Sequence, residues 1–152
     1  MRMVMLLAIG VWLLLSAYAN AELANDENVH VSDYLDALAS ATHGQSTESD
    51  IDAVLDYYSD EIVYEHPRFG MRLEGKEAQR HGMVAFLKSY AGGPSDSSIE
   101  ILDFMKGDGM VTLHLEVAFL QEREGAVVRV SREQFRVLEF SSGRISRVID
   151  YW

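Results

Sequence analysis

The chain lacks cysteine altogether and has few basic residues for its length of 152. Without disulfides, the domain must owe its stability to a hydrophobic core, and an apolar content of 48% fits one globular domain. Only 13 Lys and Arg stand against 24 Asp and Glu, which gives a formal net charge of −11. Binding to nucleic acid or to an anionic membrane surface depends mainly on Lys and Arg, so neither partner is expected. We interpret the negative charge as favouring solubility.

Motifs that define several classes of enzyme are also absent. No His-x-x-x-His pair, cysteine or cluster of carboxylates indicates a metal site. The sequence contains no glycine-rich phosphate loop and no Gly-x-Ser-x-Gly elbow of the serine hydrolases. It therefore predicts no metal and no cofactor.

The apolar run over residues 4–15 is shorter than the roughly 20 residues of a membrane-spanning helix. It follows a weakly basic start, and residues 16–21 supply the small residues of an Ala-x-Ala cleavage site. This pattern predicts a secretory signal peptide over residues 1–21, with an uncleaved anchor as the alternative. Cleavage would remove Arg2 and take the net charge from −11 to −12. No cysteine is available for a lipid anchor, so we expect a secreted or periplasmic protein without a stable membrane anchor after cleavage.

The rest of the chain has the pattern of one α+β domain over residues 31–152, after a disordered acidic lead-in over residues 22–30. Apolar residues at helical spacing predict a helix over 31–42, and Thr47 and Asp50 form a capping box for a second helix with Tyr58 on its apolar face. A third helix is expected over 76–90. Strands are expected over residues 62–66, 98–106, 110–122, 126–140 and 144–152, with a further short one at 73–74.

The strand that precedes Pro67 ends in a histidine. If Ile62, Tyr64 and His66 share one face, the imidazole lies at the mouth of whatever the sheet encloses. An imidazole there could act as a general base near neutral pH. The alternative is a histidine that is exposed or held by a structural hydrogen bond.

The last two predicted strands can be paired through a two-residue turn at Ser142–Gly143. This register places Phe135 opposite Asp150 and Glu133 opposite Trp152. The face with these residues is mostly apolar and is expected to pack on the helices, whereas the opposite face carries Arg132, Gln134, Arg136 and Arg147. A bulge in the hairpin would reverse the assignment.

An enclosed carboxylate is costly unless it is paired or protonated. Glu133 and Asp150 are therefore candidates for acid, base or hydrogen-bond-donor roles. The alternative for each is a strand-end carboxylate that reaches solvent or pairs with an arginine. Tyr34 lies on the apolar stripe of the first helix, where core packing is its default role, although a buried phenol is also a good donor to a developing oxyanion.

Several local strings resemble the NTF2-like superfamily, and most closely its SnoaL-like polyketide cyclases and ketosteroid isomerases. They are residues 31–38, 58–67, 75–78, 134–137 and 143–148. The resemblance implies a cone, in which a curved antiparallel sheet packs on two to three N-terminal helices around a deep apolar pocket. It also implies a homodimer formed through the sheet.

The resemblance to ketosteroid isomerases assigns a role to individual residues. Tyr34 takes the place of their oxyanion tyrosine, His66 that of the general-base aspartate, and Glu133 that of the protonated oxyanion aspartate. The residue type differs at His66 and Glu133. Asp150 lies near the acid/base aspartate of the SnoaL-like cyclases.

We therefore expect the cone to bind a small apolar molecule without a cofactor. Its predicted lining comprises the four residues above with Tyr64, Met83, Phe86, Phe135 and Trp152. If the protein is an enzyme, the expected chemistry is proton abstraction next to a carbonyl, as in an isomerase or cyclase, with His66 or Asp150 as base and Tyr34 and Glu133 holding the enolate oxygen. The alternatives are a non-catalytic binder of small ligands and a dimeric protein-interaction module.

Overall fold

The computed structural model describes residues 31–89 and 95–152, so the predicted signal peptide and lead-in lie outside the described residues. Three α-helices, α2 (Val31–Ala41), α3 (Glu48–Leu55) and α4 (Lys76–Ser89), and one 3-10 turn, η1 (Pro67–Phe69), are found. The strands are β1 (Tyr58–His66), β2 (Met71–Glu74), β3 (Ser95–Gly107), β4 (Met110–Arg123), β5 (Ala126–Ser141) and β6 (Arg144–Tyr151). In the described part of the chain, no helix is long and apolar enough to cross a membrane.

The helices form largely where the apolar spacing predicts them. The capping box at the start of α3 is present, and the backbone N–H of Thr47 donates to Asp50 Oδ2 at 2.7 Å. The predicted position of Tyr58 on that helix is wrong, because α3 ends at Leu55 and Tyr58 begins β1. The carbonyl of Tyr57 accepts a hydrogen bond from Ile145 N at 2.9 Å, so pairing with β6 overrides the helical pattern here.

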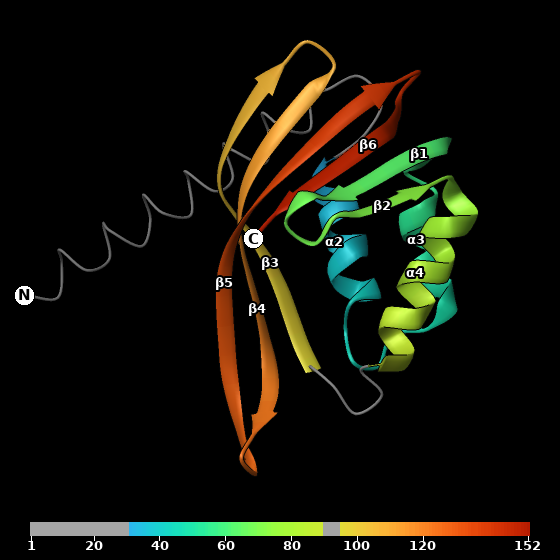
Figure 1. Ribbon diagram of the computed structural model, residues 1–152. Helices are drawn as coiled ribbons and strands as arrows, with labels where there is room; N and C mark the ends of the chain where they lie inside the picture. Colours follow the sequence, from blue (N-terminus) through green and yellow to red (C-terminus); the bar gives the residue numbers. More distant parts are fainter. Residues whose placement is uncertain (1–30, 90–94) are drawn as a thin grey trace, which may run out of the picture.

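The six strands form one strongly twisted sheet in the order β2-β1-β6-β5-β4-β3. All neighbours are antiparallel except β1 and β6, which are parallel, so the sheet is mixed rather than wholly antiparallel as predicted. The helices lie on one side of the sheet, and the β4–β5 hairpin extends beyond them (Figure 1). This is the α+β cone that the sequence predicts.

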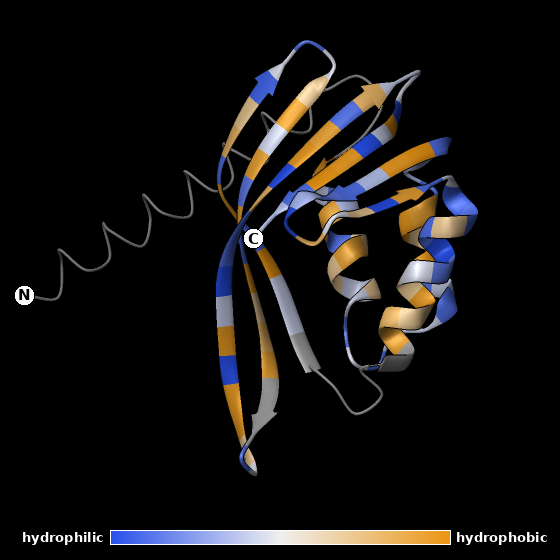
Figure 2. Ribbon diagram, in the orientation of Figure 1, coloured by the Kyte–Doolittle hydropathy of each residue, from blue (hydrophilic) through white to orange (hydrophobic). Residues whose placement is uncertain are grey.

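The core lies between the helices and the inner face of the sheet. Apolar and polar residues alternate along the long strands (Figure 2), so that one face of each strand packs inward. The residues buried there include Tyr34, Ile51, Ile62, Leu113, Leu115, Leu138, Ile145 and Val148. The inner face of β1 carries Ile62, Tyr64 and His66, as the alternation predicts. Between them, Val63 and Glu65 pair with Arg147 and Ile149 of β6.

The register of the β5–β6 hairpin corrects the predicted one. Ser141 pairs with Arg144 and Phe140 with Ile145, as a two-residue turn requires, but Glu139 then pairs with Arg147. One extra residue of β6, Ser146, is therefore left in a bulge, and its hydroxyl donates to the Glu139 carbonyl at 3.2 Å. Beyond the bulge every pair is shifted by one.

The shift reverses the predicted faces of β5. Arg136, not Phe135, lies opposite Asp150, and Gln134 and Arg136 are buried on the inner face. Glu133 and Phe135 are on the outer face, and Phe135 is 49% exposed. The predicted inward positions of Glu133 and Phe135 are therefore wrong, because a bulge inverts the side-chain alternation of one strand relative to the other.

Candidate functional site

A buried ion pair lies at the centre of the inner face, between β5 and β6. Arg136 Nε donates to Asp150 Oδ1 at 2.6 Å, and Arg136 Nη2 donates to Asp150 Oδ2 at 2.7 Å. Both side chains are almost fully enclosed. This two-point geometry satisfies both carboxylate oxygens, which is the condition under which a buried ion pair is tolerated.

Three tyrosines extend the ion pair into a network that spans the interior. Tyr64, on β1, donates its hydroxyl to Asp150 Oδ2 at 3.1 Å. Arg136 Nη1 donates to the hydroxyl oxygen of Tyr34, on α2, at 3.3 Å, and the hydroxyl oxygens of Tyr34 and Tyr58 lie 3.1 Å apart. The network thus joins β1, β5, β6 and helix α2.

The electrostatics of the network keep the three phenols neutral. Burial raises the pKa of Tyr34 and, still more, that of Tyr58. Burial and the nearby Asp150 carboxylate likewise raise the pKa of Tyr64. Burial alone would lower the pKa of Arg136, but the Asp150 carboxylate raises it well above its ordinary value. The network therefore offers hydroxyl donors and a permanently charged guanidinium, not a phenolate base.

The hydroxyls of Tyr34 and Tyr58 carry two hydrogens but share only one hydrogen bond with each other. The contact from Arg136 uses an acceptor lone pair of Tyr34, not a hydrogen. Among the described residues, one phenolic hydrogen therefore has no acceptor. The pair therefore keeps one hydrogen-bond donor that no described residue uses.

His66 differs from the network because its ring is buried without partners. It is 2% exposed, and neither Nδ1 nor Nε2 has a hydrogen-bond partner among the described residues. Its ring centroid lies 4.5 Å from that of Phe69, on η1, and 4.7 Å from that of Trp152, which it meets nearly at a right angle. Two aromatic rings thus cover the imidazole at the end of β1.

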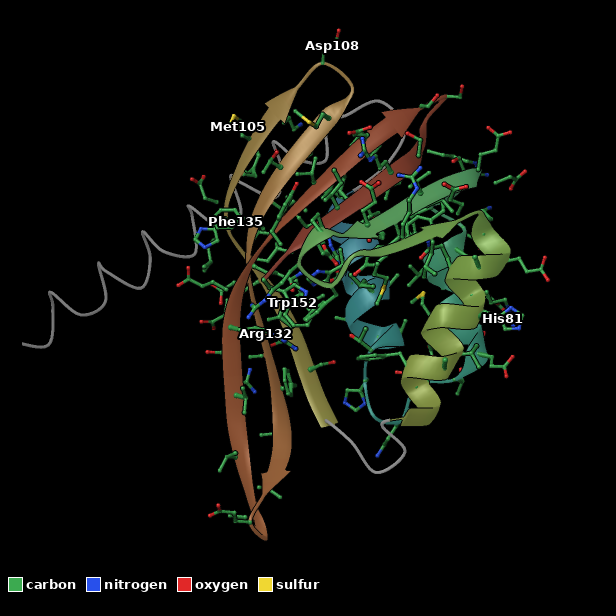
Figure 3. The ribbon with its side chains drawn as sticks, in the orientation of Figure 1. His81, Met105, Asp108, Arg132, Phe135 and Trp152 are labelled. Carbon is green, nitrogen blue, oxygen red and sulfur yellow. The ribbon has the colours of Figure 1, made fainter. Side chains whose placement is uncertain are left out.

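Other predicted site residues are not brought to this place. Met83 packs against the core from α4, and Phe86, on the same helix, is exposed. Glu133 lies on the outer face, where its Oε2 is 2.8 Å from His114 Nε2. Phe135 stacks on the His114 ring and points away from the helices (Figure 3). The predicted residues that belong to the network or to the surroundings of His66 are Tyr34, Tyr64, His66, Asp150 and Trp152.

Two open surface clefts lie outside the network. The larger, of about 590 Å³, is lined from α2 and β3, and the other, of about 510 Å³, lies beside the β5–β6 turn. No predicted site residue lines either of them. In residues 31–89 and 95–152, no group of three or more His, Asp or Glu is arranged to hold a metal ion.

The sequence-based prediction missed Arg136, Tyr58 and Phe69. A signal for Arg136 was present in the β4–β5 hairpin, whose two-residue turn at Glu124–Gly125 gives an unbroken register. That register places Arg136 opposite Leu113, on the apolar face of β4. The two hairpins thus predict opposite faces for β5, and only a bulge reconciles them.

Comparison with known proteins agrees with this geometry. Residues 31–148 match the sequence profile of the SnoaL-like domain, so the chain belongs to the SnoaL-like family. None of the curated proteins is significantly similar to it in sequence.

Solved structures share the fold at low sequence identity. A protein described as a SnoaL-like polyketide cyclase, from Shewanella putrefaciens, superposes with a TM-score of 0.59 at 15% identity, covering 79% of this chain and 84% of the other. A protein with a ketosteroid isomerase-like fold from Catenulispora acidiphila, solved in complex with trimethylamine, gives a TM-score of 0.55 at 15% identity, with coverages of 79% and 85%. At this identity the likeness shows the NTF2-like fold and not the activity.

The ion pair leads to a test by double-mutant cycle. Replacing Asp150 with Ala should lower the free energy of unfolding by about 3–5 kcal/mol, because it leaves the Arg136 charge buried and unpaired. The double variant Asp150→Ala, Arg136→Met should lose clearly less than the sum of the two single losses. Urea denaturation of the four proteins measures both. As a control, Tyr64→Phe removes one hydrogen bond to Asp150 and should cost about 1 kcal/mol. Additive losses would contradict the direct coupling.

Proposed function

We propose that this SnoaL-like protein binds a small, largely apolar molecule inside the cone, with His66 as its main polar contact. The observation that supports this most directly is the enclosed imidazole with two unpartnered nitrogens. Leaving a buried polar group unsatisfied costs about 1–3 kcal/mol, and packing does not require a histidine between two aromatic rings. A ligand that hydrogen-bonds the ring would offset this cost.

Access to His66 requires a movement. Phe69 and Trp152 lie directly against the ring, and both are partly exposed. Phe69 belongs to the short turn η1, which is followed by Gly70 in the left-handed region at φ 60°. Displacing either aromatic side chain opens a path from solvent to the imidazole.

If the bound molecule is also converted, the arrangement favours His66 over Asp150 as the base. Both Asp150 oxygens already accept hydrogen bonds from Arg136, and one of them also accepts from Tyr64. His66, by contrast, has free nitrogens. A ring nitrogen would take a proton from the carbon next to a carbonyl, and the free phenolic hydrogen of the Tyr34–Tyr58 pair would stabilise the enolate oxygen. Returning the proton to another carbon completes an isomerisation without a cofactor.

The exchange His66→Phe tests the role of the ring nitrogens. It keeps an aromatic ring between Phe69 and Trp152 and removes two unpartnered polar atoms, so thermal stability should stay the same or rise. Native mass spectrometry of the purified protein should show a co-purified small molecule that this variant loses. The matched control is His81→Phe, since His81 lies on the exposed side of α4 (Figure 3). Ligand retention by the His66 variant, or a marked loss of its stability, would contradict the proposal.

The homodimer remains a prediction, and the outer face of the sheet is the surface on which it can be tested. His114, Phe135 and Tyr151 form one cross-strand row there, and Phe135 and Tyr151 are 49% and 47% exposed. A contiguous apolar patch on a sheet face is typical of an interface, and a second copy can bind it about a two-fold axis.

Light scattering of the variant Phe135→Glu should therefore give half the mass of the unmodified protein. The control Phe86→Glu places the same charge on helix α4, where Phe86 is exposed, and should leave the mass unchanged. A monomeric mass for the unmodified protein would rule the dimer out.

Export is likewise proposed from the composition of residues 1–21. The expected result is a periplasmic or secreted protein whose first residue, by N-terminal sequencing, is Glu22. Recovery of the chain from the cytosol with residues 1–21 still attached would contradict it.

A further inference from the structure

Most arginines of the described chain are engaged by acidic side chains or by backbone oxygens. Those in contact with a carboxylate are Arg72, Arg80, Arg136 and Arg147. The guanidinium of Arg144 donates to the backbone carbonyls of Asp56 and Tyr58. Pairing of this kind is expected in a chain with 24 acidic and 13 basic residues.

Arg132 is an exception beside the His66 site. Its guanidinium carbon lies 4.1 Å from the ring centroid of Trp152 and 5.4 Å from that of Phe119, on the inner side of β4. Arg132 and Trp152 lie close together beside β5 (Figure 3). Among the described residues no carboxylate is within ion-pair distance of Arg132. The guanidinium is therefore supported on aromatic faces with its N–H groups open to solvent.

Arg68 approaches the same tryptophan and is engaged by its backbone oxygen. Its Nη1 donates to the backbone oxygen of Trp152 at 3.0 Å, and its guanidinium carbon is 5.9 Å from the Phe69 ring centroid. No Asp or Glu side chain of the described chain pairs with Arg68. Two guanidinium groups thus contact the two aromatic residues that cover His66.

The charge of Arg132 has no acidic partner beside Trp152, and a bound anion would compensate it. A guanidinium matches a carboxylate in shape and number of donors, and stacking on an aromatic ring holds it in position. The apolar rings of Phe69 and Trp152 meanwhile suit the apolar body of a ligand. Positive charge and apolar surface therefore lie together beside His66.

We propose that Arg132 and Arg68 recognise a carboxylate, so that the ligand of the cone is a small apolar molecule with a carboxylic acid group. This inference rests on the binding function proposed above and narrows its ligand class. The overall electrostatic potential of the protein disfavours the binding of an acid, because a net charge of −11 repels anions. A preference for an acid must therefore come from local guanidinium groups.

The test uses two probes of the same shape, 2-naphthoate and its neutral amide, 2-naphthamide. Isothermal titration calorimetry should show naphthoate binding about fivefold to tenfold more tightly at low salt, with the preference shrinking as salt screens the charges. The double variant Arg68→Gln, Arg132→Gln should lose the preference or reverse it, while naphthamide affinity stays unchanged. The control Arg80→Gln removes the same kind of charge from the distant α3–α4 surface and should keep the preference.

The outcomes separate the two proposals. Equal affinity of the unmodified protein for both probes, or a preference that survives in the double variant, overturns carboxylate recognition and leaves the binding function standing. Failure of both probes to bind at millimolar concentration counts against the binding function and the inference together. Unchanged melting temperatures of the arginine variants verify that the comparison is made between folded proteins.

Discussion

The contact between Arg136 and Asp150 is the interaction on which the rest of the interior depends. It crosses the β5–β6 boundary at 2.6 and 2.7 Å and continues through Tyr64 to β1 and through Tyr34 to helix α2. An apolar interior tolerates the two charges only because each is paired. The burial of Arg136 and Asp150 is therefore favourable only when all four elements are in place. The same contact places polar groups in an otherwise apolar interior.

Two kinds of buried polar group are therefore found side by side in this protein. Those of the network are satisfied and add to the cooperativity of the fold. His66 is not satisfied, and its burial between Phe69 and Trp152 makes the fold less stable than an apolar ring at that position would. If His66 binds a ligand as proposed, this residue trades stability for function, which is the usual relation between a scaffold and its site.

Much of the fold could be predicted from residue patterns, and the site only in part. The alternation of Ile62, Tyr64 and His66 indicates the inner face of β1 because side-chain direction in a strand is a local property. The orientation of Glu133 and Arg136 is not local, since it depends on how β5 is aligned with both neighbours. The position of Tyr58 is not a local property either, because its spacing predicts a helix but pairing with β6 places it in a strand. The direction of side chains within one strand can be predicted from the sequence, whereas the register of β5 depends on its pairing with both β4 and β6.

The bulge at Ser146 has a consequence for how the chain is compared with its relatives. On one side of this residue β5 and β6 are aligned as the turn dictates, and on the other they are out of step by one position. A relative that lacks the extra residue would keep Arg136 opposite Asp150, because the bulge takes up Ser146 without changing the pairs on either side of it. In an alignment across this point, the columns are therefore equivalent in space when the gap is placed at Ser146. An insertion or deletion of a single codon at this bulge can accordingly leave the buried ion pair in place.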